Sequence, residues 1–122
     1  MLRVGIVRLG NISSRHIPAW QTIYDAEITA VCDCREELLC KVPHARGYTD
    51  FVQMLQQEKL DIVDICVPTY LHTVFALSAL GQGIHVICEK PISLEKNDVQ
   101  KLYSVAKKKG VVYGGPCISV LA

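Results

Sequence analysis

The chain has 122 residues, half of them hydrophobic, and its 13 basic and 12 acidic side chains give a formal net charge of +1. This balance excludes a general electrostatic field for nucleic acid or an anionic membrane surface, and no apolar run approaches the roughly 20 residues that span a bilayer. Because Arg3 and Arg8 bracket only Val-Gly-Ile-Val, the N-terminus is not typical of a signal peptide, and we expect one soluble, cytoplasmic domain over residues 1–122.

Runs rich in β-branched residues alternate with stretches of helical periodicity along the chain. The expected strands are Leu2–Val7, Ala26–Cys32, Asp61–Val67, Ile84–Cys88 and Val111–Tyr113. The expected helices are about Asn11–Tyr24, Arg35–Cys40, Asp50–Glu58, Leu71–Gly81 and Leu94–Lys109. This alternation predicts an α/β fold.

The ends of several expected helices carry local signals. Asp50 and Ser93 can each accept hydrogen bonds from the first amides of the helix that follows. Gly83 and Gly110 follow two helices, where glycine commonly ends the helical conformation. Lys107–Lys109 form the only charge run, which favours a basic last helical turn over a nucleic-acid patch.

The expected strand Asp61–Val67 is apolar at nearly every position, which is typical of a sheet covered on both faces. Together with the strict alternation of strand and helix, this predicts a doubly wound parallel sheet with right-handed crossovers, in three α/β/α layers. Such sheets bind ligands beyond the carboxyl ends of their strands, next to the first strand.

Six cysteines raise the question of disulfides or a metal site. They are Cys32, Cys34, Cys40, Cys66, Cys88 and Cys117. Four of them lie in or at the end of apolar runs, namely Cys32, Cys66, Cys88 and Cys117. Small secreted scaffolds instead place cysteines in polar loops. No C-x-x-C pair is present, and no histidine follows at zinc-finger spacing. We expect reduced thiols that pack as small hydrophobic side chains; a thiol or metal role for Cys32 and Cys34 is the weaker alternative.

The turn after the first strand reads Arg8-Leu-Gly-Asn-Ile-Ser13, and only Gly10 matches the motif G-x-G-x-x-G. Glycine at this place lets backbone amides approach a pyrophosphate at a helix N-terminus. Ser13 is small enough for helix–strand packing, but Arg8 replaces the glycine of the tight turn. We expect Arg8 to crowd the pyrophosphate more than its charge attracts it. The alternative is a simple strand-to-helix turn.

Asp33 follows the second expected strand, 23 residues beyond Gly10. A carboxylate at this place accepts hydrogen bonds from the adenosine ribose of a dinucleotide and repels a 2′-phosphate. Asp33 therefore favours NAD over NADP, while Arg35 close by leaves NADP open. Asp33 as the mere start of the next helix is the alternative, but its spacing from Gly10 favours dinucleotide binding.

Two later strand ends open onto the same edge of the sheet. Pro68 ends one strand and directs Thr69 and its neighbours over the ligand position, and His72 falls in the first turn of the next helix, where a neutral imidazole is favoured. Lys90 follows the next strand, where it can donate to a ribose hydroxyl or a substrate oxygen, with Glu89 orienting it. A solvated loop lysine is the alternative.

Four motifs occur in order: Val4-Gly-Ile-Val-x-Leu-Gly-Asn-Ile-Ser, Ala30-Val-Cys-Asp33, Asp61-x-Val-Asp-Ile-Cys-x-Pro-x-x-x-His72 and Glu89-Lys-Pro91. Over about residues 2–113 they resemble the N-terminal half of the glucose–fructose oxidoreductase and inositol dehydrogenase family (Gfo/Idh/MocA). The resemblance implies a Rossmann domain, NAD or NADP as cofactor, and a sugar, inositol or polyol substrate that is oxidised or reduced at a carbinol carbon.

The same resemblance implies roles for individual residues. Lys90 matches the lysine that contacts the nicotinamide ribose and the reacting hydroxyl, so it is the catalytic candidate. The other matches are Gly10, Asn11 and Ile12 in the pyrophosphate turn, Asp33 at the ribose, and Pro68, His72 and Glu89 along the cofactor.

Enzymes of this family continue into a second α/β domain, which supplies most substrate contacts and usually an Asp and a His of the catalytic set. The chain ends at Ala122, about where that domain would begin, and residues 113–122 depart from the family pattern. We therefore expect a fragment or a truncated relative, inactive alone and prone to form homo-oligomers. The alternative is a stand-alone NAD-binding or interaction module without catalysis.

Overall fold

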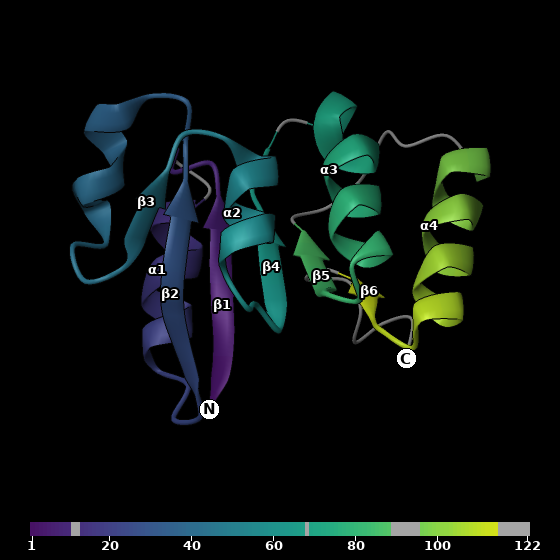
Figure 1. The fold of residues 1–122 in the computed structure, drawn as a ribbon, viewed down its shortest axis with the longest axis horizontal. Coiled ribbons are helices and arrows are strands. Elements are labelled where there is room, and N and C mark those ends of the chain that lie inside the picture. The colour runs from purple at the N-terminus through teal and green to yellow at the C-terminus, as the bar shows by residue number, and fades with distance from the viewer. Residues whose placement is uncertain (11–12, 68, 89–95, 115–122) are drawn as a thin grey trace.

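The computed structural model describes residues 1–10, 13–67, 69–88 and 96–114, with the backbone alone for residues 69, 70 and 72. Its strands are β1 (Leu2–Val7), β2 (Ala26–Cys32), β3 (Arg46–Tyr48), β4 (Ile62–Ile65), β5 (His85–Cys88) and β6 (Tyr113–Gly114). They form one sheet in the order β3-β2-β1-β4-β5-β6, and every neighbouring pair is parallel (Figure 1). This is the strand order of the Rossmann fold, so the predicted fold class is confirmed.

Helices cover both faces of the sheet. They are α1 (Ser13–Gln21), the 3-10 helix η1 (Glu36–Lys41), α2 (Phe51–Gln57), α3 (Thr69–Gly81) and α4 (Lys96–Lys109). One core cluster joins α1 and η1 to one face of the sheet, and the other joins α2, α3 and α4 to the opposite face, which gives the three predicted layers. None of the helices in the described part of the chain is both long and apolar enough to cross a membrane.

The strand β3 was not predicted. It is short, its residues are exposed or half-buried, and it lies at the edge of the sheet, so it lacks the apolar run that marks the inner strands. Side chains hold it in place, because the Tyr48 hydroxyl donates to the buried carboxylate of Glu58 and Arg46 Nε lies 2.8 Å from that carboxylate. The helix expected at Arg35–Cys40 is a 3-10 helix shifted by one residue.

The predicted helix signals that fall in the described residues are confirmed. Asp50 accepts hydrogen bonds from the amides of Val52 and Gln53 at the start of α2, at 2.9 and 3.5 Å. Gly83 and Gly110 adopt positive φ angles of 78° and 70° beyond α3 and α4. Ser93 lies outside the described residues.

We expect Asp50→Ala to lower the free energy of unfolding by about 1 kcal/mol, the usual cost of removing a helix N-cap. Asp50 is exposed, so the change leaves no cavity. Urea unfolding measured by circular dichroism checks this, with Asp50→Asn as the control that retains a capping oxygen. Equal midpoints for the wild type and Asp50→Ala would contradict the capping role.

Candidate functional site

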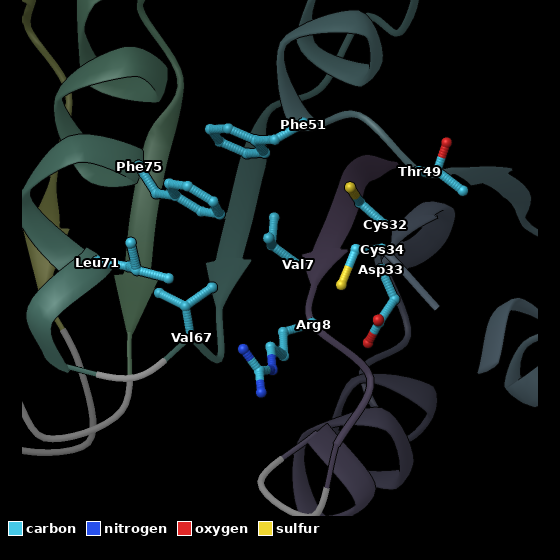
Figure 2. Close-up of a pocket in the computed structure, with 10 residues that line it drawn as sticks. All are labelled: Val7, Arg8, Cys32, Asp33, Cys34, Thr49, Phe51, Val67, Leu71 and Phe75. Atoms are coloured by element: carbon cyan, nitrogen blue, oxygen red, sulfur yellow. The ribbon is translucent and has the colours of Figure 1, made fainter. Parts of the chain in front are cut away.

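A pocket opens at the carboxyl ends of β1 and β2, beside α2 and α3 (Figure 2). Its apolar wall contains the rings of Phe51 and Phe75, which stack with centroids 4.7 Å apart. The other lining residues are Val7, Arg8, Cys32, Asp33, Cys34, Thr49, Val67 and Leu71. Its volume of about 160 Å³ is below the ~300–1,000 Å³ of pockets that enclose a drug-sized ligand. The pocket therefore suits one ring-sized end of a longer ligand.

Asp33 lies at the rim of this pocket with 3% of its surface exposed. Its Oδ2 accepts a hydrogen bond from the Leu9 amide and its Oδ1 accepts one from the Arg35 amide, both at 2.8 Å. Burial by itself raises the pKa of this carboxyl, but the two amide hydrogen bonds and the positive charges of Arg35 and Arg8 bring the pKa below its usual value. Each carboxylate oxygen has further acceptor capacity, so the fixed anion can still receive ligand hydroxyls.

The lowered pKa of Asp33 makes folding stability depend on pH. The ionised carboxylate stabilises the fold above the usual aspartate pKa of about 3.9, and this contribution is lost as the pH falls through the lower folded pKa. We expect the wild type to lose more unfolding free energy than Asp33→Asn between pH 7 and pH 3. Urea unfolding at several pH values measures the difference. Parallel stability curves for the two proteins would contradict it.

The turn between β1 and α1 has an unusual backbone. Arg8 adopts a φ of 75°, the left-handed conformation that normally requires glycine, and its amide donates to the Cys32 carbonyl at 2.7 Å. Gly10 follows, and a Cβ built there meets no atom within 4 Å among the described residues. The buried Ser13 hydroxyl donates to the Gly10 carbonyl at 2.8 Å at the start of α1.

This geometry fits a dinucleotide. None of the described atoms lies within 4 Å of a Cβ built at Gly10, which precedes a helix N-terminus, where amides and the helix dipole favour a phosphate. The Asp33 carboxylate keeps acceptor capacity for hydroxyl groups of a ligand, and the apolar pocket suits a flat ring. Arg8 is the departure, because its side chain lies at the mouth of the pocket, on the side of Val67 (Figure 2).

Other predicted site residues are placed only in part. Arg35 is exposed and its Nε lies 3.8 Å from Asp33 Oδ1. Thr69 and His72 belong to the first turn of α3, and the structure describes only the backbone of these two residues. Asn11, Ile12, Pro68, Glu89 and Lys90 lie outside the described residues, so their roles stay predictions.

The cysteines divide by burial. Cys32, Cys66 and Cys88 are buried, Cys34 and Cys40 are exposed, and Cys117 lies outside the described residues. The expectation of small buried side chains is wrong for the two exposed thiols, which follow β2 in polar sequence rather than within a strand. Burial, reinforced by the charge of Asp33, raises the pKa of Cys32 to about 12, which does not favour a reactive thiolate there.

Sequence reasoning missed a buried polar cluster on the other face of the sheet, formed by His16 and Trp20 of α1 with Asp64 of β4 and Cys66. Two signals were available. An aspartate interrupts the apolar strand Ile62–Ile65, and His16 and Trp20 are four residues apart, which places them on one face of a helix.

Comparison with known proteins gives the family. The chain is 30% identical over 115 residues to myo-inositol 2-dehydrogenase of Thermotoga maritima and 34% identical over 116 residues to D-glucoside 3-dehydrogenase of Escherichia coli. Each match takes in 91% of this chain but only 34% and 33% of the relative, so the chain spans about a third of the length of these relatives.

A solved structure, the WlbA dehydrogenase from Bordetella pertussis in complex with NADH and UDP-GlcNAcA, is similar at a TM-score of 0.85 and 30% identity. The match covers 93% of this chain and 36% of that one. Residues 2–115 also match the sequence profile described as "Oxidoreductase family, NAD-binding Rossmann fold". The chain therefore belongs to the Gfo/Idh/MocA oxidoreductase family.

Proposed function

We propose that the chain binds NAD at the pocket beyond β1 and β2, and that it is the nucleotide-binding part of a dehydrogenase acting on the CH–OH group of a sugar, inositol or polyol. The observation that carries the proposal is the buried Asp33 carboxylate at the rim of an apolar pocket, at the end of the strand next to the one that leads into the turn at Gly10. NAD is preferred to NADP because a fixed anion at this place repels a 2′-phosphate.

Each part of the site has a separate task in this proposal. The wall with Phe51 and Phe75 receives the adenine ring, and Asp33 accepts hydrogen bonds from the ribose hydroxyls. The amides at the start of α1 receive the pyrophosphate. When bound, the nicotinamide ring takes a hydride at C4 from the substrate carbinol carbon. Lys90 is proposed to hold the reacting oxygen, on the resemblance of Glu89-Lys-Pro91 alone.

The substrate class rests on the relatives. Those named above act on an inositol and a glucoside, and the similar solved structure holds a nucleotide-linked sugar derivative. These compounds share secondary hydroxyl groups on a six-membered ring. A ring-shaped polyol or a sugar is therefore the substrate class that we propose for the protein to which this chain belongs.

Isothermal titration calorimetry of the 122-residue chain with NAD tests the binding claim. We expect saturable binding with one site per chain, and weaker binding to Asp33→Ala. The matched control is Asp25→Ala, which removes an exposed carboxylate distant in sequence from the turn. The absence of saturable binding to folded wild-type protein would contradict the proposal.

We expect the 122-residue chain alone to bind NAD without oxidising a polyol. Hydride transfer requires a base within hydrogen-bond reach of the substrate hydroxyl, and Asp98 is the only Asp or His in the sequence after Pro91. An absorbance assay for NADH with inositol, glucose and a methyl glucoside measures turnover. Steady NADH production proportional to the concentration of the chain would contradict this prediction.

We also expect the chain to self-associate. Several large apolar side chains are exposed, among them Tyr24, Val74 and Val112, and β3 and β6 are edge strands of the described sheet. Exposed apolar surface and open strand edges favour contact with another chain. Light scattering over a concentration series should show a rising mean mass, and a constant monomer mass would contradict the expectation.

A further inference from the structure

Asp64 is an exception in the interior of the protein. It lies in β4 between β1 and β5, opposite Ile6 and Ile87, and is 1% exposed. Its strand is otherwise apolar and buried at all four positions. A carboxylate buried in such surroundings is strongly unfavourable unless polar partners compensate it, so the partners of Asp64 have to be strong.

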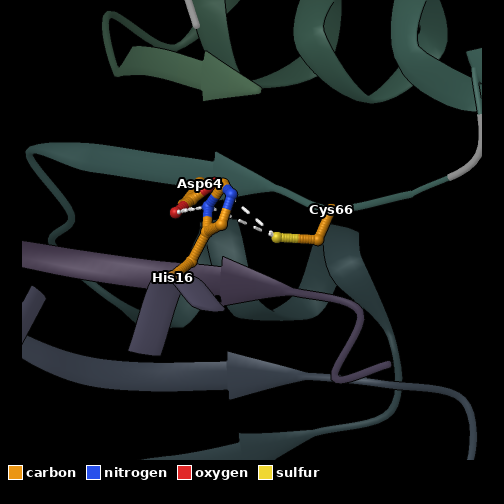
Figure 3. Close-up of side chains that lie close together, drawn as sticks. All are labelled: His16, Asp64 and Cys66. Carbon is orange, nitrogen blue, oxygen red and sulfur yellow. Dashed lines mark hydrogen bonds and ion pairs between the residues drawn. The ribbon is translucent and has the colours of Figure 1, made fainter. Parts of the chain in front are cut away.

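Two of these partners come from successive turns of α1, and Figure 3 shows the first of them, His16, beside Asp64 and Cys66. His16 Nδ1 lies 2.6 Å from Asp64 Oδ2, and Trp20 Nε1 donates to the same oxygen at 2.8 Å. The Cys66 thiol donates to Asp64 Oδ1 at 3.7 Å. Hydrogen bonds are directional, so they restrict the rotation and sliding of a helix more narrowly than apolar contacts do. The pair His16 and Trp20 therefore fixes both the rotation and the axial position of α1 against β4.

The position of α1 determines where the amides of its first turn lie. The helix begins at Ser13, whose hydroxyl holds the Gly10 carbonyl, and His16 is one turn further on. The amides of this first turn are the ones that face an anion. A small movement of α1 relative to β1 would misplace those amides, while the pocket at Asp33 on the opposite face of the sheet would remain.

The geometry does not favour two other uses of these side chains. In a Cys–His–Asp relay the thiol and carboxylate meet different ring nitrogens, but Cys66 Sγ and Asp64 Oδ2 both approach Nδ1 of His16, at 3.8 and 2.6 Å. The three groups lie close enough to hold a metal ion. However, Asp64 Oδ2 already meets both donors from α1, and burial raises the pKa of the Cys66 thiol to about 11.

We propose that His16, Trp20 and Asp64 form an anchor that positions the first turn of α1 for the cofactor pyrophosphate, without touching the cofactor. All three residues affect cofactor binding only through the position of α1. This inference rests on the proposed function, because it assigns a task to the helix that would receive the phosphates.

The test compares ADP with adenosine as probes, since the two differ only in the phosphates. We expect Asp64→Asn to weaken ADP binding about tenfold, the size of a lost helix N-terminus contribution, and to leave adenosine binding unchanged. Trp20→Phe removes one donor and should give a smaller loss in the same direction. Dissociation constants are measured by NMR titration at a temperature where every variant is folded.

The control is Val86→Ala, a substitution in β5 in the opposite core cluster that is expected to lower the melting temperature. A merely structural role of Asp64 predicts that Asp64→Asn and Val86→Ala change ADP and adenosine binding alike, and that result would overturn the inference.

Stoichiometric Zn²⁺ binding that blocks alkylation of Cys66 would overturn the inference in favour of a metal site. If wild-type protein binds neither ADP nor NAD, the proposed function fails, whereas unchanged ADP binding in Asp64→Asn rejects the anchor alone.

Discussion

The chain should bind NAD about 10-fold to 100-fold more tightly than NADP, and Asp33→Ser should remove most of that preference. Asp33 is buried at the pocket rim and is held by the amides of Leu9 and Arg35, so its carboxylate cannot move away from a 2′-phosphate. Its lowered pKa keeps it charged at neutral pH. Calorimetric titration of both proteins with both dinucleotides measures the change.

Arg35 provides the control for this prediction. Its guanidinium is exposed and lies near Asp33, while its amide holds the carboxylate. Arg35→Ala removes the guanidinium and keeps the amide, so it should leave NAD binding nearly unchanged. Equal or tighter binding of NADP by the wild type, lost in Arg35→Ala, would show that Arg35 rather than Asp33 determines the cofactor preference.

Replacing Arg8 with glycine should both stabilise the fold and tighten NAD binding. Arg8 has a φ of 75°, and a side chain in the left-handed region costs roughly 1 kcal/mol relative to glycine. Relief of this strain should raise the melting temperature by a few degrees, about 4 °C per kcal/mol for a domain of this size. The side chain also lies at the mouth of the pocket, so its removal should open the path to Gly10.

Arg8→Ala separates the two effects. It removes the bulk and the charge but retains a Cβ at positive φ, so it should tighten NAD binding without raising the melting temperature. The competing effect is attraction between the guanidinium and the phosphates. Weaker NAD binding in both variants would show that the charge of Arg8 assists the ligand and that crowding is the smaller effect.

The sequence predicted those features that local chemistry determines. Buried strands such as Ile62–Ile65 are apolar whatever surrounds them, and Asp50 caps α2 through atoms two and three residues away. The place of Asp33 also followed from local order, because a residue that directly follows an inner parallel strand lies at the carboxyl edge of the sheet.

Features that depend on distant partners were missed. The strand β3 is held by pairing with β2 and by contacts between Arg46, Tyr48 and Glu58, none of which produces a periodic pattern. The anchor of His16 and Asp64 joins residues 48 positions apart. The left-handed backbone at Arg8 contradicts the preference of its residue type, because the turn geometry overrides it.

An NMR titration of ¹⁵N-labelled chain with NAD shows whether the pocket and the turn after β1 receive a dinucleotide. We expect saturable shifts of the Leu9, Gly10 and Arg35 amide resonances with one common dissociation constant, while the Gly110 amide resonance beyond α4 does not shift. Adenosine should shift the Arg35 resonance and leave that of Gly10 nearly unchanged. Saturable shifts confined to other parts of the chain, or none at all on folded protein, would show that the pocket and this turn do not receive the dinucleotide.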